Sequence, residues 1–150
     1  MLHTTFQKLT IIHYQVKKHL LAAGTWGDAE KVGQLIRTCY VTSAIANQVL
    51  VEVATAGASE VVGVLLQARA SADYAETTLD EKTALHAACE AGQEDTAALL
   101  ISSMSAAGVR RKTRSGGHTA MDILRRSDMN GMARRLEAIF AQTQTQTDRD

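Results

Sequence analysis

A histidine and a cysteine stand three residues apart in the stretch DEKTALHAACEAGQ, residues 80–93 of this 150-residue chain. Residues three apart lie on one face of a helix, so His86 and Cys89 could share a metal ion or pair as base and nucleophile. The alternative is structural: His86 forms hydrogen bonds with the backbone and Cys89 fills a core. The elements that position these two side chains decide between the two interpretations.

No other group of residues in the sequence indicates an active site. Phosphate-binding glycine motifs and the nucleophile elbow are absent. The acid pairs Asp80-Glu81 and Glu94-Asp95 are expected at a loop tip and at a helix start, where the helix dipole alone favours acids. We therefore expect no enzyme, no cofactor and no metal. The remaining histidines make no recurrent ligand spacing; they are His3, His13, His19 and His118.

Composition indicates one domain, because 45% of the residues are apolar, enough to bury a sizeable core. The two cysteines, Cys39 and Cys89, form no C-x-x-C pattern, which fits a reducing compartment. No apolar run approaches the roughly 18 residues of a membrane span. The segment before Asp28 lacks acids, as an import peptide does, but it also lacks arginine. We expect an intracellular, cytoplasmic protein, with an organelle as the alternative.

The net charge of zero hides a partition along the chain. Residues 1–37 carry five basic and two acidic groups, or +3; residues 38–103 carry two and nine, or −7; residues 104–150 carry nine and five, or +4. A basic footprint over the whole domain, as in a dedicated nucleic-acid binder, is therefore not predicted.

The sequence repeats with a period near 35 residues. TALHAACEAGQEDTAALLI, residues 83–101, aligns with QVLVEVATAGASEVVGVLL, residues 48–66, at an offset of 35. KHLLAAGTWGDAEKVGQLI, residues 18–36, fills the same positions upstream, and residues 119–139 give a weaker copy with Asp128 in place of the glycine. Each copy predicts two short helices separated by a left-handed turn, and their apolar faces must be buried by stacking.

The motifs TALHAACEAG and GGHTAMDIL resemble the ankyrin repeat, whose signature is T-P-L-H-x-A-A followed by glycine and a second helix. The chain departs from the signature in lacking proline, so that Thr83-Ala84 replaces its T-P, and in keeping the histidine only at His86. The resemblance implies that His86 hydrogen-bonds backbone between neighbouring turns and that Cys89 is a small core residue.

The resemblance also implies the fold and its divisions. We expect an all-α ankyrin-repeat solenoid of helix-turn-helix units with an N-terminal helical cap. The expected divisions are a cap at residues 2–17, repeats at 18–47, 48–82, 83–118 and 119–141 within a domain of residues 1–142, and a polar tail at 143–150.

The two ends differ in character. Apolar residues at helical spacing predict an amphipathic N-terminal helix whose stripe packs on the first unit; its alternative is a helix offered to a partner, which would explain Ile11, Ile12 and Tyr14 in close succession. The C-terminal AQTQTQTDRD is polar and predicts disorder. The stripe consists of Leu2, Phe6, Leu9, Val16 and Leu20, with Ile12 and His13 between.

In ankyrin arrays the variable positions of the first helices face a concave groove, and the resemblance places a partner there. Trp26 suits a binding hot spot; its alternative is to pack under the N-terminal segment. The positions carried over are Ala22, Thr25 and Trp26 in the first unit, Glu52, Thr55 and Ala56 in the second, and Ala87, Glu90 and Ala91 in the third.

Two expected hairpin fingers carry opposite charge. The acidic finger, ARASADYAETTLDEK, contains Asp73, Glu76, Asp80 and Glu81 around Tyr74; the basic finger, GVRRKTRSGG, contains Arg110, Arg111, Lys112 and Arg114. The arginines suit an acidic or phosphorylated protein segment or an RNA backbone, with solvation as the plain alternative. No aromatic residue is interleaved to stack on bases, which disfavours nucleic acid. Thr113 and Ser115 are candidate phosphorylation sites.

These patterns favour a non-catalytic protein–protein interaction module, acting as an adaptor or as a small structural subunit of a larger complex. One alternative is an ankyrin-type inhibitor that docks on an enzyme. Another is an RNA-associated or ribosome-associated protein that uses the basic finger.

Overall fold

The computed structural model describes residues 2–39, 41–68, 70–76 and 80–149. Helices dominate these residues, and one short antiparallel ribbon joins Ala75 to Thr83 and Glu76 to Lys82. The elements are α1 (Leu2–Thr25), α2 (Ala29–Thr38), α3 (Ser43–Ala56), α4 (Ser59–Ala68), β1 (Ala75–Glu76), β2 (Lys82–Thr83), α5 (Ala84–Glu90), α6 (Glu94–Ser103), α7 (Ala106–Val109), α8 (Ala120–Arg126) and α9 (Asn130–Arg149).

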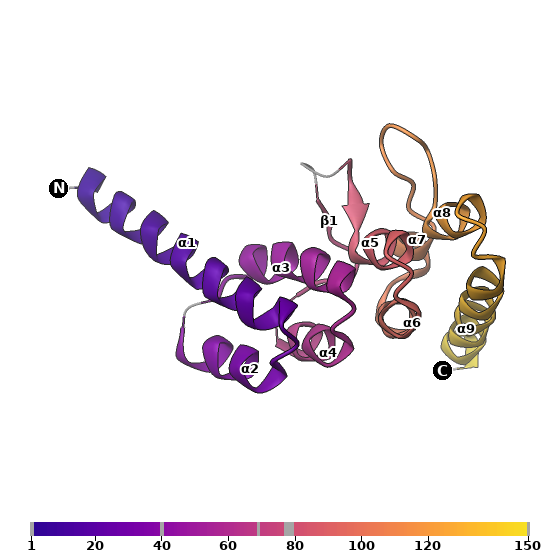
Figure 1. The fold of residues 1–150 in the computed structure, drawn as a ribbon, viewed down its shortest axis with the longest axis horizontal. Helices are drawn as coiled ribbons and strands as arrows, with labels where there is room; N and C mark the ends of the chain where they lie inside the picture. Colours follow the sequence, from indigo (N-terminus) through magenta and orange to yellow (C-terminus); the bar gives the residue numbers. More distant parts are fainter. Residues whose placement is uncertain (1, 40, 69, 77–79, 150) are drawn as a thin grey trace.

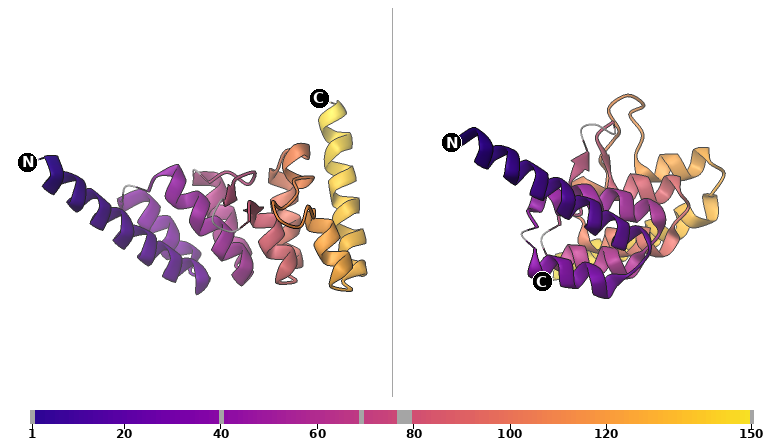
Figure 2. Two further views of the ribbon diagram at one scale, coloured as in Figure 1. Left: turned by 90° about the horizontal axis from the view of Figure 1, so that it is seen from above. Right: turned by 60° about the vertical axis from the view of Figure 1, so that its left-hand side comes forward.

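The helices form two rows (Figures 1 and 2). In the first row α1 contacts α3, α3 contacts α5, and α5 contacts α8; in the second, α2 contacts α4, α4 contacts α6, and α6 contacts α9. Each helix of one row also contacts its sequence neighbour in the other. The chain is therefore an all-α helical repeat solenoid, as predicted. The numerical limits of its units stay a prediction.

The turns inside the helix pairs follow the repeat alignment. Gly27, Gly57 and Gly92 have φ of 76°, 76° and 72°, and Asp128, aligned with them, has φ of 62°. Glycine adopts this left-handed region without a Cβ penalty, and aspartate is among the few other residues that tolerate it. The left-handed turn predicted at these positions is confirmed.

Threonines begin the first helices of the later units. The side chains of Thr42, Thr83 and Thr119 accept a hydrogen bond from the backbone N–H three residues on. At Thr83 and Thr119 the bond is reciprocated by His86 and Asp122, which completes a capping box. The T-x-x-H and T-x-x-D spacings of the sequence thus fix where α5 and α8 start.

The core lies between the two rows. Large leucines there alternate with alanines, among them Ala54, Ala88 and Ala97 at 0% exposure, which let the helices approach closely. No described helix is long and apolar enough to span a bilayer. The buried leucines, each at 0% or 1% exposure, are Leu20, Leu50, Leu65, Leu85, Leu100, Leu124 and Leu136.

The structure corrects the expectation for the N-terminus. The predicted cap and the first helix of the first unit form one continuous helix, α1, because no glycine, proline or capping residue interrupts the sequence near residue 17. The stripe does not pack along its whole length on the first unit. Phe6 is 73% exposed and Leu9 49%, whereas Leu20 is fully buried.

The predicted disorder of the C-terminal tail is also wrong. Residues 143–149 continue α9, and the hydroxyls of Thr143 and Thr145 bond back to the carbonyls of Ile139 and Ala141, each at 2.9 Å. The apolar part of α9 is anchored by Leu136, and glutamine has a good helix propensity, so the helix extends past its packed portion.

Candidate protein-interaction surface

The His86 and Cys89 pair lies inside the solenoid, on α5. His86 is 1% exposed and Cys89 0%. Burial raises the pKa of the Cys89 thiol to about 12, so the thiolate that metal binding or nucleophilic attack requires is suppressed. Among the described residues no three His, Cys, Asp or Glu side chains are grouped to hold a metal ion. Cys89 is the small core residue that the resemblance implied.

His86 forms a hydrogen bond with the backbone. Its Nδ1 accepts a hydrogen bond from the Thr83 N–H at 3.1 Å and lies 2.9 Å from the Thr83 hydroxyl, so in the neutral ring the proton sits on Nε2. Nε2 is buried without a hydrogen-bond partner among the described residues, although the Arg111 and His118 carbonyls lie near enough to raise the pKa. Burial outweighs them and lowers the pKa of His86. The defined bond lies within its own turn, and the Arg111 and His118 carbonyls that act on the ring belong to the neighbouring finger, in line with the expected role between neighbouring turns.

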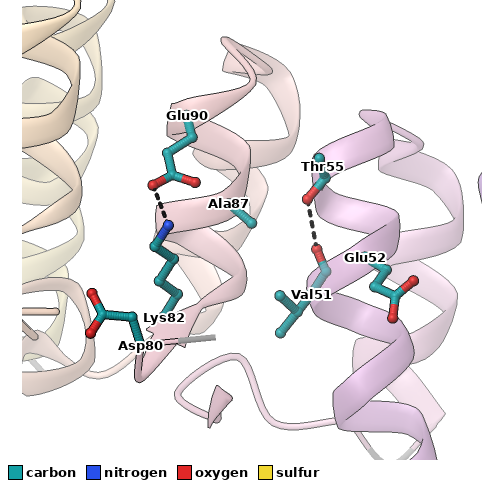
Figure 3. A pocket seen from close by; sticks show the side chains of 7 residues that line it. All are labelled: Val51, Glu52, Thr55, Asp80, Lys82, Ala87 and Glu90. Atoms are coloured by element: carbon teal, nitrogen blue, oxygen red, sulfur yellow. Dashed lines mark hydrogen bonds and ion pairs between the residues drawn. The ribbon is translucent and has the colours of Figure 1, made fainter. Parts of the chain in front are cut away.

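A hollow of about 360 Å³ opens between α3 and α5 (Figure 3). Val51, Glu52 and Thr55 come from α3, Ala87 and Glu90 from α5, and Lys82 and Asp80 from the ribbon side. The structure thus brings together Glu52, Thr55 and Glu90, three residues predicted for the groove. The sequence reasoning missed Lys82, whose signal was its position just before the Thr83 cap.

Some polar side chains of this hollow have partners within the described part of the chain and one does not. Lys82 Nζ lies 2.7 Å from Glu90 Oε1, and the Thr55 hydroxyl donates to the Val51 carbonyl at 3.2 Å. Glu52 is exposed and has no ion-pair partner among the described residues. The hollow therefore offers one free carboxylate beside the nearly buried side chains of Val51 and Ala87.

Glu52 also lines a second hollow, of about 250 Å³, between α1 and α3. Its other lining residues are Tyr14, Lys17, Lys18 and Leu21. The two hollows share one carboxylate and cross three consecutive helices of the first row. We call the combined surface the Glu52 groove.

The two fingers are not separate patches of opposite charge. The Glu81 carboxylate lies 3.8 Å from Arg111 and 3.5 Å from Arg114, and Asp80 accepts two hydrogen bonds from Ser115. Acidic and basic fingers project side by side from the first row (Figures 1 and 2). Several of the charged groups that were predicted to attract a partner are thus paired with groups on the neighbouring finger.

The other basic residues of the finger differ in exposure and contact. Arg110 lies over the Phe140 ring, 5.4 Å from its centroid, and Lys112 is exposed. Thr113 is 7% exposed and its hydroxyl accepts from the His118 N–H at 3.3 Å, so it is a poor phosphorylation site. Ser115 is exposed but bonded to Asp80.

Asp73 and Tyr74, predicted for partner binding, make structural contacts. Asp73 accepts a hydrogen bond from the Ser105 N–H at 3.0 Å, beside the start of α7. The Tyr74 hydroxyl donates to Glu76 at 3.0 Å, and its pKa is raised by burial and by that carboxylate. Glu76 itself is 8% exposed. These hydrogen bonds stabilise the conformation of the acidic finger.

Trp26 is 88% exposed, so packing under the N-terminal segment is wrong. It lines a shallow hollow with His19, Ala22 and Asp28 at the turn between α1 and α2, apart from the Glu52 groove. Thr25, next to it, bonds back to the Leu21 carbonyl at 2.9 Å. Both residues lie outside the Glu52 groove, and their role in partner binding stays a prediction, with Trp26 accessible for it.

Residues 80–114 match the family model for the ankyrin repeat, and a search of curated proteins found no match. The matched stretch runs from the tip of the acidic finger through α5, α6 and α7 into the basic finger. Ankyrin repeats are generally protein–protein interaction modules and are typically non-catalytic. Residues 80–114 are thus similar to an ankyrin repeat, and the two rows of stacked helices are consistent with ankyrin-like repeats.

Proposed function

We propose that this chain is an adaptor, or a small structural subunit of a larger complex, that binds a segment of a partner protein in the Glu52 groove. The observation that carries the proposal is the free Glu52 carboxylate, shared by two hollows of the first row. A carboxylate beside apolar surface suits the long side chain of a lysine or an arginine, whose methylenes pack while the charge is paired.

The charges along the groove suggest an order of charges in the bound segment. Lys17 and Lys18 lie on the α1 side of Glu52, and the Lys82–Glu90 pair lies on the α5 side. A segment with a basic residue over Glu52 and an acidic residue toward Lys17 and Lys18 would complement both. Charge complementarity of this kind sets specificity and the rate of association more than affinity.

The alternatives receive less support. Three of the four basic side chains of the basic finger already contact other residues of the chain. Arg111 and Arg114 lie near Glu81, and Arg110 lies over Phe140. That leaves Lys112 for a phosphate backbone, so we do not propose RNA binding. An inhibitor of an enzyme could use the Glu52 groove, and the identity and activity of the captured partner would distinguish it from an adaptor.

The test is an affinity capture from the native source with the full chain, comparing the wild type with Glu52→Lys. Glu60→Lys is the matched control, because Glu60 is an exposed glutamate at the start of α4, in the other row. We expect stoichiometric partners to be lost with Glu52→Lys and kept with Glu60→Lys. Partners that survive Glu52→Lys unchanged would rule out the groove as their binding site.

A further inference from the structure

Helix α1 is much longer than the neighbour it packs against. It has 24 residues and α3 has 14. At about 1.5 Å per residue, α1 exceeds α3 by roughly 15 Å. Its N-terminal part runs beyond α2 and α3 and is drawn free of other elements in every view (Figures 1 and 2). We call residues 4–12, which are all exposed, the α1 overhang.

One apolar seam runs along the packed and the free parts of α1. Phe6, Leu9, His13, Val16 and Leu20 are separated by alternating steps of three and four residues, the spacing of a coiled-coil seam. Leu20 is buried in the core and Val16 packs against it. Leu9 and Phe6, farther along the same face, are exposed by 49% and 73%. The face that packs inside the solenoid thus continues outside it, where no other described element covers it.

The charge of α1 restricts what covers this face. The first 27 residues contain Lys8, Lys17 and Lys18 and no aspartate or glutamate. Two copies that paired through the overhang would bring these lysines together with no acid between them. A partner with acidic residues beside an apolar seam would pair with them instead, as charges flanking a coiled-coil seam do.

The shape of the site also matters. Farther along α1, toward its C-terminal end, the helix packs on α3. At the end of the exposed seam α3 therefore forms a step about one helix diameter high, roughly 10 Å. This step keeps a flat bilayer surface away from Leu9, whereas a helix laid against the overhang ends at the step. A helical partner therefore fits the corner better than a membrane does.

We propose that the α1 overhang is a docking site for an amphipathic helix of another protein, with an apolar seam flanked by aspartate or glutamate. Phe6, Leu9 and Ile12 supply the apolar contact, and Lys8 and Lys17 select the acidic flanks. The site shares Lys17 with the Glu52 groove but does not include Glu52. Glu52→Lys leaves the overhang unchanged, so it separates a failure of this proposal from a failure of the function proposed for the groove.

The first experiment measures fluorescence anisotropy of two labelled helical peptides titrated with the full chain. Both peptides carry leucine at the seam positions; one has glutamate and its twin has lysine at the flanking positions. We expect the glutamate peptide to bind about tenfold more tightly than its twin, with a difference that shrinks as salt rises. Equal binding of the two peptides, or no binding of the glutamate peptide, would overturn the proposal.

Variants locate the site. Phe6→Gln with Leu9→Gln should weaken the glutamate peptide by about tenfold or more, because two exposed apolar contacts are lost. Ile11→Gln, a matched change on the other face of α1, should weaken it by less than about threefold. Lys8→Glu with Lys17→Glu should reverse the preference between the peptides. Binding that is insensitive to the Phe6 and Leu9 changes would place it elsewhere and overturn the proposal.

Two further measurements test the other occupants. Sedimentation velocity of the full chain should show a monomer; a dimer abolished by the Phe6 and Leu9 changes would assign the face to a second copy. Flotation with vesicles of phosphatidylcholine and phosphatidylserine should leave the chain unbound. Vesicle binding abolished by the same changes would assign the face to an anionic membrane, against the proposal.

Discussion

Asp80 holds Ser115 by two hydrogen bonds, one from the backbone N–H to Oδ1 at 2.8 Å and one from the hydroxyl to Oδ2 at 2.7 Å. The two residues are 35 positions apart, the period of the repeat. The Asp80 carbonyl also accepts the Arg114 N–H at 3.0 Å. Asp80 therefore ties the acidic finger to the basic finger, and the two fingers present one joint surface.

Removing the Asp80 carboxylate should loosen the basic finger and leave the helices intact. In Asp80→Ala we expect faster amide hydrogen exchange at Ser115 and unchanged exchange in α5, measured by NMR. Glu60→Ala, an exposed glutamate without a described contact to the finger, is the control. Unchanged exchange at Ser115 in Asp80→Ala would show that the contact does not hold the finger.

The same contact should depend on pH. The hydrogen bonds from Ser115 hold the pKa of Asp80 below its ordinary value. A carboxyl whose folded-state pKa is lowered adds stability above its unfolded pKa, about 3.9, and loses it as the pH falls through the folded value. We expect the Ser115 amide to stay protected at neutral pH and to lose protection below about pH 4.

His86 should contribute to stability through burial and through its cap on α5. His86→Ala removes a nearly buried ring and the acceptor of the Thr83 N–H, so we expect a loss of roughly 2–3 kcal/mol in the free energy of unfolding. Urea denaturation followed by circular dichroism would measure it. His19→Ala, which changes an exposed histidine of α1, should cost less than about 0.5 kcal/mol.

The pH dependence of that loss follows from the sign of the pKa shift. Burial lowers the pKa of His86, so near pH 6 the unfolded chain binds a proton that the folded chain does not. The wild type should therefore lose stability as the pH falls below the unfolded pKa of about 6.5, and the difference in free energy of unfolding between the wild type and His86→Ala should narrow as it does so. A constant difference would show that His86 titrates alike in both states.

The turns and the core were predictable from the sequence because they are local or periodic. Asp128 illustrates this, since the alignment placed it in a glycine position and its φ is 62°. The ties between fingers were not predictable. Asp80 meets Ser115 only when one unit stacks on the next, and nothing local to either residue signals that contact. The exposure of Phe6 was missed for a related reason: a stripe indicates a face to be buried but not the length of the neighbour that buries it.

The two cysteines should differ sharply in reactivity. Cys89 is 0% exposed with a pKa near 12, whereas Cys39, at the end of α2, is half-buried. We expect a thiol reagent to modify Cys39 in the folded chain and Cys89 only as the chain unfolds, because only the thiolate reacts. Mass spectrometry of trypsin fragments over time would show the order. In Cys39→Ser the fast reaction should disappear, and fast modification of Cys89 would contradict its burial.

Arg110 and Phe140 should couple the basic finger to α9. The guanidinium lies 5.4 Å from the ring centroid, a cation–π geometry worth about 0.5–1 kcal/mol at an exposed site. A double-mutant cycle of Arg110→Ala and Phe140→Leu, with stability measured by urea denaturation, should give a coupling of that size. The control cycle uses Arg134→Ala, since Arg134 is exposed on α9 and has no described ring contact. A coupling of about zero in the first cycle, equal to the control, would mean that α9 and the finger are held together by the core alone.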